Sequence, residues 1–169
     1  MFSYFAEYVK VFNHNSAGGI YFKSRADALS KNPDNPNANL FSRLNQLDKY
    51  KGSDGNFKFK LCYPEFDKCN EWIQSSNPAT DTTIKGFKPI SLAFEKNGNL
   101  GPWTGLGTQN SDSAVLIDDA PTSWHWHCAI GATSSWPDKP RFPGPQGEAN
   151  PWASRGVTQV ELYVWTFVH

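Results

Sequence analysis

The sequence has little charge and no excess of either sign. Charged residues make up 19% of its 169 residues, with 16 basic and 16 acidic side chains. Nucleic acids and anionic membrane surfaces attract clustered Lys and Arg, so this balance argues against both as main partners. Long apolar runs are also missing, since none approaches the roughly 20 residues of a membrane span, and we expect no membrane insertion.

Signals for processing and catalysis are scarce as well. The first residues lack the basic stretch of a signal peptide, and Glu7 interrupts their apolar side chains. We therefore expect either a cytosolic protein or a mature chain with an added initiator Met. The sequence holds no G-x-S-x-G elbow, no Gly-rich phosphate loop that opens a helix and no H-E-x-x-H motif, so we do not expect an enzyme.

Aromatic residues and chain breakers, in contrast, are frequent. Aromatic side chains account for 15% of the sequence, and 13 Gly and 12 Pro interrupt it. Frequent breakers disfavour long helices because Gly and Pro destabilise helix interiors. The composition is typical of a compact, loop-rich protein with aromatic surface left over for another use.

Local patterns predict a short helical region followed by strands. Alternating residues predict a strand at 7–13, a capping pattern predicts a short helix at 25–31, and apolar spacing predicts an amphipathic helix at 38–50. Further strands are predicted at 57–62, 71–74, 89–94, 114–117, 124–130 and 158–168. With no repeat or linker signal, we expect one α+β domain over residues 1–169, with a mainly antiparallel, sandwich-like β core and a short helical region near the N-terminus.

The three cysteines leave two interpretations open. Cys62 and Cys69 flank a short Pro-containing loop and are suited to a disulfide-closed turn, which would leave Cys128 free or bridging two chains in a secreted protein. The alternative is three reduced, buried thiols in a cytosolic protein. A zinc site would need a fourth ligand and C-x-x-C spacing, neither of which is present.

An acidic pair, Asp118-Asp119, follows an apolar stretch near the densest run of oxygen-bearing side chains. Adjacent carboxylates at a strand end are costly unless a cation or donors neutralise them. Because Ca²⁺ takes about six to eight oxygen ligands, we expect a calcium site formed by Asp118, Asp119, Glu95 and Gln109. The alternative is that one of the two aspartates caps a turn.

The segment Trp-His-Trp-His-Cys at 124–128 allows three interpretations. In a strand, His125 and His127 share one face and the remaining side chains the other. The histidines of a zinc hydrolase would need a third ligand that the sequence does not supply. The second interpretation is a core strand with solvated histidines, and the third is a ligand site lined by these rings.

Aromatic rings beside oxygen-bearing side chains favour a sugar as ligand. The C–H face of a sugar packs on an aromatic ring, while its hydroxyls need donors, acceptors or a cation. We therefore expect Asn110 and His125 to hydrogen-bond sugar hydroxyls, and Trp126 or Trp103 to stack on the sugar ring. Neutral net charge agrees with a neutral ligand.

Several short motifs together resemble a domain of cnidarian extracellular proteins. They are Cys69–Pro78 (CNEWIQSSNP), Trp103–Gly107 (WTGLG), Leu116–Asp119 (LIDD), Ile130–Ala132 (IGA), Pro143–Pro145 (PGP) and Val160–Val164 (VELYV). As a whole, over about residues 8–168, the chain resembles the calcium-dependent, galactose-binding lectins of sea anemones.

The resemblance implies a secreted lectin of the nematocyst or mucus type that recognises terminal galactose through bound Ca²⁺ and forms a homodimer. Pairing would let a protein with one site cross-link two cells, and Cys128 is the candidate bridge. The Q-P-D, E-P-N and W-N-D triplets of C-type lectins are absent, so their fold and site geometry are not transferred. The rival hypothesis is a structural extracellular module whose Trp and Asp residues serve the core and turns and whose partner is another protein.

Overall fold

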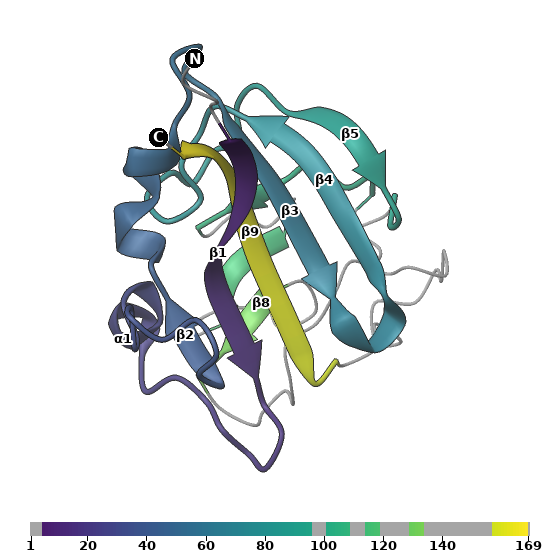
Figure 1. The fold of residues 1–169 in the computed structure, drawn as a ribbon. Coiled ribbons are helices and arrows are strands. Elements are labelled where there is room, and N and C mark those ends of the chain that lie inside the picture. The colour runs from purple at the N-terminus through teal and green to yellow at the C-terminus, as the bar shows by residue number, and fades with distance from the viewer. Residues whose placement is uncertain (1–4, 96–100, 109–113, 119–128, 134–156, 169) are drawn as a thin grey trace.

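Two β-sheets share one hydrophobic core in the computed structural model, which describes residues 5–95, 101–108, 114–118, 129–133 and 157–168. The large sheet has the strand order β2-β1-β9-β3-β4-β5, and all its described pairs are antiparallel. Its strands are β1 (Phe5–Asn15), β2 (Leu40–Ser42), β3 (Phe57–Tyr63), β4 (Lys68–Gln74), β5 (Lys88–Leu92) and β9 (Gln159–Val168). Figure 1 shows β9, the last strand of the chain, between β1 and β3.

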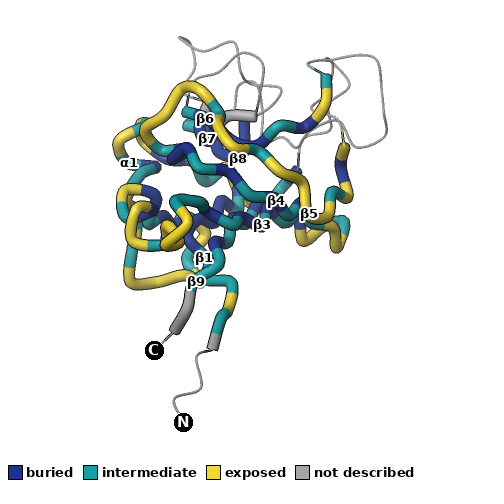
Figure 2. Tube along the Cα trace, turned by 90° about the horizontal axis from the view of Figure 1, so that it is seen from above, coloured by how far each residue is buried: buried dark blue, intermediate teal, exposed yellow. Residues whose placement is uncertain are grey.

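A smaller, parallel sheet forms the second layer behind the large one (Figures 1 and 2). It consists of β6 (Leu106–Gly107), β7 (Ala114–Asp118) and β8 (Ala129–Ala132). The layers approach closely at Gly131, where a Cβ atom would lie 2.8 Å from both Ile117 Cδ1 and Phe12 Cζ. Only a residue without a side chain fits there without displacing these neighbours.

Residue alternation explains the strands of the large sheet. In β3 the side chains of Phe57, Phe59, Leu61 and Tyr63 are buried, whereas the lysines between them point to the opposite face. Successive strand residues face opposite sides of a sheet, so this pattern buries one side of β3 and leaves the other polar. The mainly antiparallel, sandwich-like fold expected from the sequence is confirmed, while the parallel pairing of the small sheet was not expected.

The helices are short. Helix α1 (Arg25–Leu29) begins where the Ser24 hydroxyl accepts a hydrogen bond from the Asp27 amide at 3.1 Å. The 3₁₀ helices are η1 (Leu44–Tyr50) and η2 (Pro64–Phe66). No helix among the described segments is long and apolar enough to cross a membrane.

The amphipathic helix expected at 38–50 is wrong in its first half. Residues Leu40–Ser42 form β2, which pairs with β1, and only Leu44–Tyr50 are helical, as a 3₁₀ helix. Apolar residues at this spacing can also face the core from a short strand and a tight helical turn. Pairing with β1, which is distant in sequence, decides between a continuous helix and a strand followed by a 3₁₀ helix. A local sequence pattern does not show this pairing.

Buried polar side chains join the two layers. The side-chain amide of Gln74 accepts hydrogen bonds from Trp72 Nε1 and the Leu106 amide and donates to the Leu106 carbonyl, at 2.7–3.1 Å. His14 accepts from the Ala132 amide at Nδ1 and donates from Nε2 to the Ile20 carbonyl at 3.0 Å. Burial lowers the pKa of His14 to about 4, so the ring is neutral in the folded protein near neutral pH.

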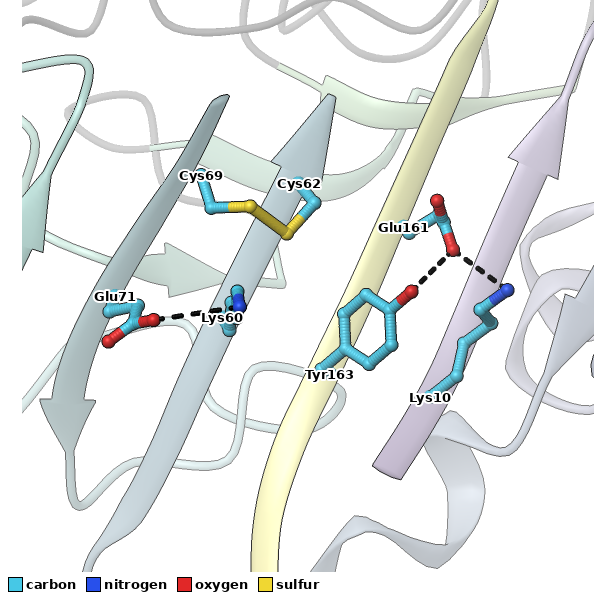
Figure 3. Close-up of a disulfide and its surroundings, with 7 residues drawn as sticks. All are labelled: Lys10, Lys60, Cys62, Cys69, Glu71, Glu161 and Tyr163. Atoms are coloured by element: carbon cyan, nitrogen blue, oxygen red, sulfur yellow. Dashed lines mark hydrogen bonds and ion pairs between the residues drawn. A yellow bond between two sulfur atoms is a disulfide. The ribbon is translucent and has the colours of Figure 1, made fainter. Parts of the chain in front are cut away.

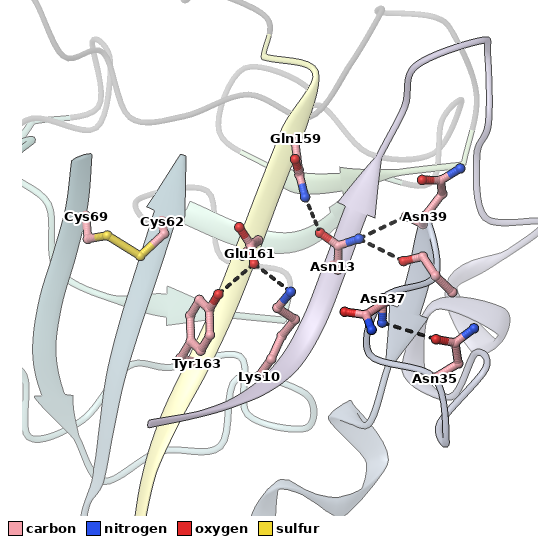
Figure 4. A network of polar contacts seen from close by, with 11 residues as sticks. Lys10, Asn13, Asn35, Asn37, Asn39, Cys62, Cys69, Gln159, Glu161 and Tyr163 are labelled. Atoms are coloured by element: carbon pink, nitrogen blue, oxygen red, sulfur yellow. Dashed lines mark hydrogen bonds and ion pairs between the residues drawn. A yellow bond between two sulfur atoms is a disulfide. The ribbon is translucent and has the colours of Figure 1, made fainter. Parts of the chain in front are cut away.

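The Asn-rich segment before β2 is held in a similar way (Figure 4). Asn13 of β1 is buried, and its amide nitrogen donates to the Ala38 carbonyl at 2.8 Å. Its amide oxygen accepts from the side chain of Gln159 on β9 at 2.9 Å. One side chain therefore connects two strands and a loop.

Candidate functional site

The side of the large sheet that faces away from the small sheet, here called the outer face, carries charged and aromatic side chains. They are Tyr8 and Lys10 of β1, Lys58, Lys60 and Cys62 of β3, Cys69, Glu71 and Ile73 of β4, and Glu161, Tyr163 and Trp165 of β9. These side chains are intermediate in exposure, whereas the alternating residues of β3, β4 and β9 are buried. The outer face is therefore where these strands can meet a ligand.

The middle of the outer face is occupied by its own contacts (Figure 3). Glu161 Oε2 lies 2.7 Å from Lys10 Nζ and accepts a hydrogen bond of 2.6 Å from the Tyr163 hydroxyl. Burial is the main cause that raises the pKa of Tyr163, and the neighbouring Glu161 carboxylate raises it further. Lys60 Nζ lies 3.8 Å from Glu71 Oε1. These groups neutralise one another and stabilise the sheet, which leaves little charge for a ligand there.

A disulfide joins β3 and β4 on the same face (Figure 3). Cys62 and Cys69 are register partners across the two strands, and their sulfurs are bonded. Of the two interpretations that the cysteines left open, the disulfide-closed turn is the one present here. The bond closes the connection that contains η2, at the end of the hairpin.

Trp165 marks the edge of the self-paired region. Its ring packs edge-to-face against Tyr8 with centroids 5.0 Å apart. Lys58 Nζ lies 4.2 Å from the Trp165 centroid and 5.6 Å from the Tyr8 centroid, in cation–π geometry. Burial, with a smaller contribution from Glu71, raises the pKa of Tyr8 to about 12. The contacts with Tyr8 and Lys58 fix the indole in place before any ligand arrives.

A pocket of about 670 Å³ opens beside this indole and is here called the Trp165 pocket. Its lining residues are Lys49, Tyr50, Lys51, Gly52, Ser53, Asp54, Asn56, Phe57, Lys58, Ile73, Trp165 and Thr166. Figure 1 shows why they meet, because the coiled segment of η1 lies beside the carboxyl end of β9. Pockets for small ligands typically measure about 300–1,000 Å³, so this volume suffices for a mono- or disaccharide.

Local hydrogen bonds hold the loop on one side of the pocket. The Gly52 amide donates to the Asn56 carbonyl at 2.8 Å, and the Asn56 amide donates to Asp54 Oδ1 at 3.0 Å. Gly55 has a φ of +81°, which a residue with a side chain rarely adopts. The hydrogen bonds from Asn56 lower the pKa of Asp54. The turn is therefore defined by its own sequence, Gly-Ser-Asp-Gly-Asn.

The chemistry of the Trp165 pocket suits binding. The indole supplies apolar surface, while hydroxyl, amide, carboxylate and ammonium groups supply hydrogen-bond donors and acceptors. A ligand with one apolar face and several polar groups satisfies both kinds of surface. Sugars have this character.

The residues expected to bind calcium and sugar fall in different places. Trp103 is 1% exposed, and its indole packs edge-to-face on Trp72 with centroids 5.2 Å apart, so its ring has no face open to a sugar. The Trp103 amide donates to the carbonyl of Glu95, whose side chain is exposed just after β5. Asp118 is the last residue of β7, opposite Ala132 of β8.

The other expected site residues lie outside the described residues. They are Asp119 and Gln109 for calcium and Asn110, His125 and Trp126 for sugar, together with Cys128. Within the part of the chain that the structure describes, no group of three or more His, Cys, Asp or Glu side chains is close enough to hold a metal ion. The calcium site stays a prediction.

Sequence reasoning missed the Trp165 pocket, although β9 contained a signal for it. Val160, Leu162 and Val164 alternate with Glu161, Tyr163 and Trp165, so the indole shares a face with a carboxylate. That alternation places Trp165 on the polar side of the strand. The nearness of the Gly52–Asn56 turn depends on the fold and has no counterpart in the local pattern.

The fold and the pocket define a disulfide-linked, mainly antiparallel β-sandwich with a ligand-sized pocket at the edge of its outer face. Comparisons of the chain with protein-family models, with curated proteins and with solved structures found no match in any of the three. The function must therefore be argued from the residues and their geometry.

Proposed function

We propose that the protein is a non-catalytic carbohydrate-binding protein that recognises glycans ending in galactose. The observation that supports this most is the Trp165 pocket, which combines an immobilised indole with hydroxyl and amide groups at a ligand-sized opening. A ring that is already held by Tyr8 and Lys58 loses little conformational freedom when a sugar packs against it.

Calcium dependence is part of the proposal and comes from the sequence pattern. Because Asp118 ends β7 of the small sheet, the calcium loop would form a second sugar position, apart from the Trp165 pocket on the outer face. Asp118, Asp119, Glu95 and Gln109 would hold Ca²⁺ and leave positions open for two neighbouring sugar hydroxyls. Ligation through O3 and the axial O4 would distinguish galactose from glucose. Asn110, His125 and Trp126 would contact the same sugar, and Trp103 is left out of this set because its ring is buried.

Secretion and pairing complete the proposal. The Cys62–Cys69 disulfide supports an oxidising compartment, because such bonds persist mainly outside the cytosol. A homodimer would let each molecule bridge two glycans, which is what agglutination requires.

A glycan array with calcium and with EDTA tests the function and its metal dependence together. We expect galactose-terminated glycans to be retained more strongly with calcium than with EDTA. Retention that EDTA does not change would contradict the calcium mechanism but leave sugar binding in place. The absence of any glycan signal from folded protein would contradict the function and favour the structural module.

Two substitutions separate the pocket from the predicted calcium loop. Trp165→Ala should weaken galactose binding at least about tenfold, and Trp165→Phe should weaken it less, because an aromatic face remains. Asp118→Ala should abolish the response to calcium without affecting the pocket. Normal binding by Trp165→Ala would remove the pocket from the proposal.

A further inference from the structure

The Trp165 pocket carries a local excess of positive charge, although the chain as a whole has no net charge. Its lining includes Lys49, Lys51 and Lys58 but only one carboxylate, that of Asp54. Ion pairs within the described residues use other lysines, namely Lys10, Lys31 and Lys60. Three ammonium groups therefore border the pocket without an ion-pair partner among the described residues.

The neighbours of these ammonium groups leave their charge uncompensated. Lys58 Nζ lies over the Trp165 ring, and Lys51 Nζ lies 5.4 Å from the centroid of the buried Phe57. Lys49 Nζ donates to the amide oxygen of Gln46 at 3.1 Å. Rings and amides position a cation but do not neutralise it, so the lysines can still bind an anion.

The single carboxylate does not compensate for them. Asp54 is exposed, and its Oδ1 accepts the Asn56 amide inside the turn, which lowers its pKa and keeps it ionised as part of the loop. With three positive groups against one negative group, the pocket attracts an anion that brings an apolar face for the indole.

We propose that the Trp165 pocket binds the anionic group of an acidic glycan, either a sulfate ester or a carboxylate on a sugar that packs against Trp165. The inference rests on the proposed carbohydrate binding and narrows its ligand class. Charge-assisted hydrogen bonds from lysine to sulfate or carboxylate are about twice as strong as neutral ones, so the acidic sugar gains affinity over its neutral counterpart.

Calorimetric titration of the whole protein with three related probes tests the inference. The probes are lactose, 6′-sulfated lactose and 6′-sialylated lactose, which share a galactose with free O3 and O4 and differ in their anionic group. We expect at least one acidic probe to bind about tenfold or more tightly than lactose at low ionic strength, and the advantage to shrink at physiological salt. The probe that gains identifies sulfate or carboxylate as the source.

Charge variants assign the preference to the pocket. Combined Lys49→Gln and Lys51→Gln should remove most of the preference while lactose still binds, because Lys58 stays in place to hold the Trp165 ring. Lys58→Arg should retain it, because the guanidinium keeps both the charge and the stacking on Trp165. Far-ultraviolet circular dichroism verifies that each variant is folded.

A matched control changes the same number of charges elsewhere. Lys23 and Lys85 are exposed and do not line the pocket, so their combined change to Gln should leave the preference intact. Equal affinity of the wild type for all three probes, or an equal loss in the control, would overturn the inference while carbohydrate binding stands. No binding of any probe would contradict the proposed function itself.

Discussion

The two faces of the large sheet use the same kinds of residue for different purposes. On the inner face Trp72 is fully buried, and its Nε1 donates to Gln74 at 2.7 Å. On the outer face Trp165 is partly exposed, packs on Tyr8 and borders a pocket. The difference shows that the number of aromatic residues says little about ligand binding until each ring is assigned to a face.

Polar groups follow the same division. Those of the inner face, such as Gln74, Asn70 and His14, make short hydrogen bonds that join strands and layers. Those in the middle of the outer face pair with one another, whereas Lys51 and Lys58 at the pocket have no ion-pair partner among the described residues. The inner face should therefore determine stability and the pocket should determine binding.

The largest expected loss of stability comes from a substitution on the inner face. Trp72→Ala should lower the free energy of unfolding by about 3–5 kcal/mol, because it leaves a cavity among buried rings and removes the partner of Gln74. Trp165→Ala should lower it by only about 1 kcal/mol, since the ring is partly exposed. Urea unfolding of both variants measures the contrast, and equal losses would contradict the assignment of the two rings to different roles.

The next largest loss of stability should come from lowering the pH, because His14 is buried in its neutral form. Its pKa is about 4 in the folded protein against an ordinary 6.5, so the unfolded chain binds a proton first as the pH falls. The stability that depends on a neutral His14 is fully present above pH 6.5. As the pH falls to about 4, the free energy of unfolding should drop by about 3 kcal/mol.

Urea unfolding across this pH range measures the loss, with His14→Gln as the control. Gln at this position does not titrate, so its variant should be less stable near neutral pH but should show a flatter dependence between 6.5 and about 4. An unchanged slope in the variant would show that other groups cause the acid sensitivity.

The outer face contributes stability chiefly through its covalent bond. Cys62→Ser with Cys69→Ser should cost about 2–3 kcal/mol, the loop-closure value for a short connection. Glycan affinity should change little, because neither cysteine lines the Trp165 pocket. Denaturant titrations with and without reductant measure the stability, and a parallel loss of glycan affinity at temperatures where the variant is folded would argue against separate roles.

The smallest effect is expected within the self-paired region. Tyr163→Phe removes the hydrogen bond to Glu161 but leaves the Lys10 ion pair, so it should cost about 1 kcal/mol or less. Thermal unfolding compares it with the wild type. A loss as large as that of Trp72→Ala would show that the outer-face network determines stability as strongly as the core does.

The sequence was sufficient to predict the structure where a local pattern and the tertiary structure agree. Alternation in β3 and β9 predicted both strands, and the short Pro-containing loop between Cys62 and Cys69 indicated their disulfide as one of two interpretations. It was insufficient where distant segments decide. Residues Leu40–Ser42 are a strand because β1 pairs with them, and the parallel pairing of β7, a strand predicted at 114–117, has no local signal.

The ligand site shows the same limit. Trp103 was expected to stack on a sugar because it lies near oxygen-rich residues in sequence, but Trp72 covers it in the fold. The Trp165 pocket needs η1 and the Gly52–Asn56 turn to meet β9, and that contact joins segments more than a hundred residues apart. No local motif records this proximity.

Nuclear magnetic resonance of the indole N–H groups during a lactose titration tests the central claim most directly. The seven Trp side chains give separate probes, and Trp165→Phe assigns the signal of Trp165 by its disappearance. The account predicts that lactose shifts the Trp165 signal while those of Trp72 and Trp103 stay nearly unchanged. A Trp165 signal that does not move while lactose binds would contradict it.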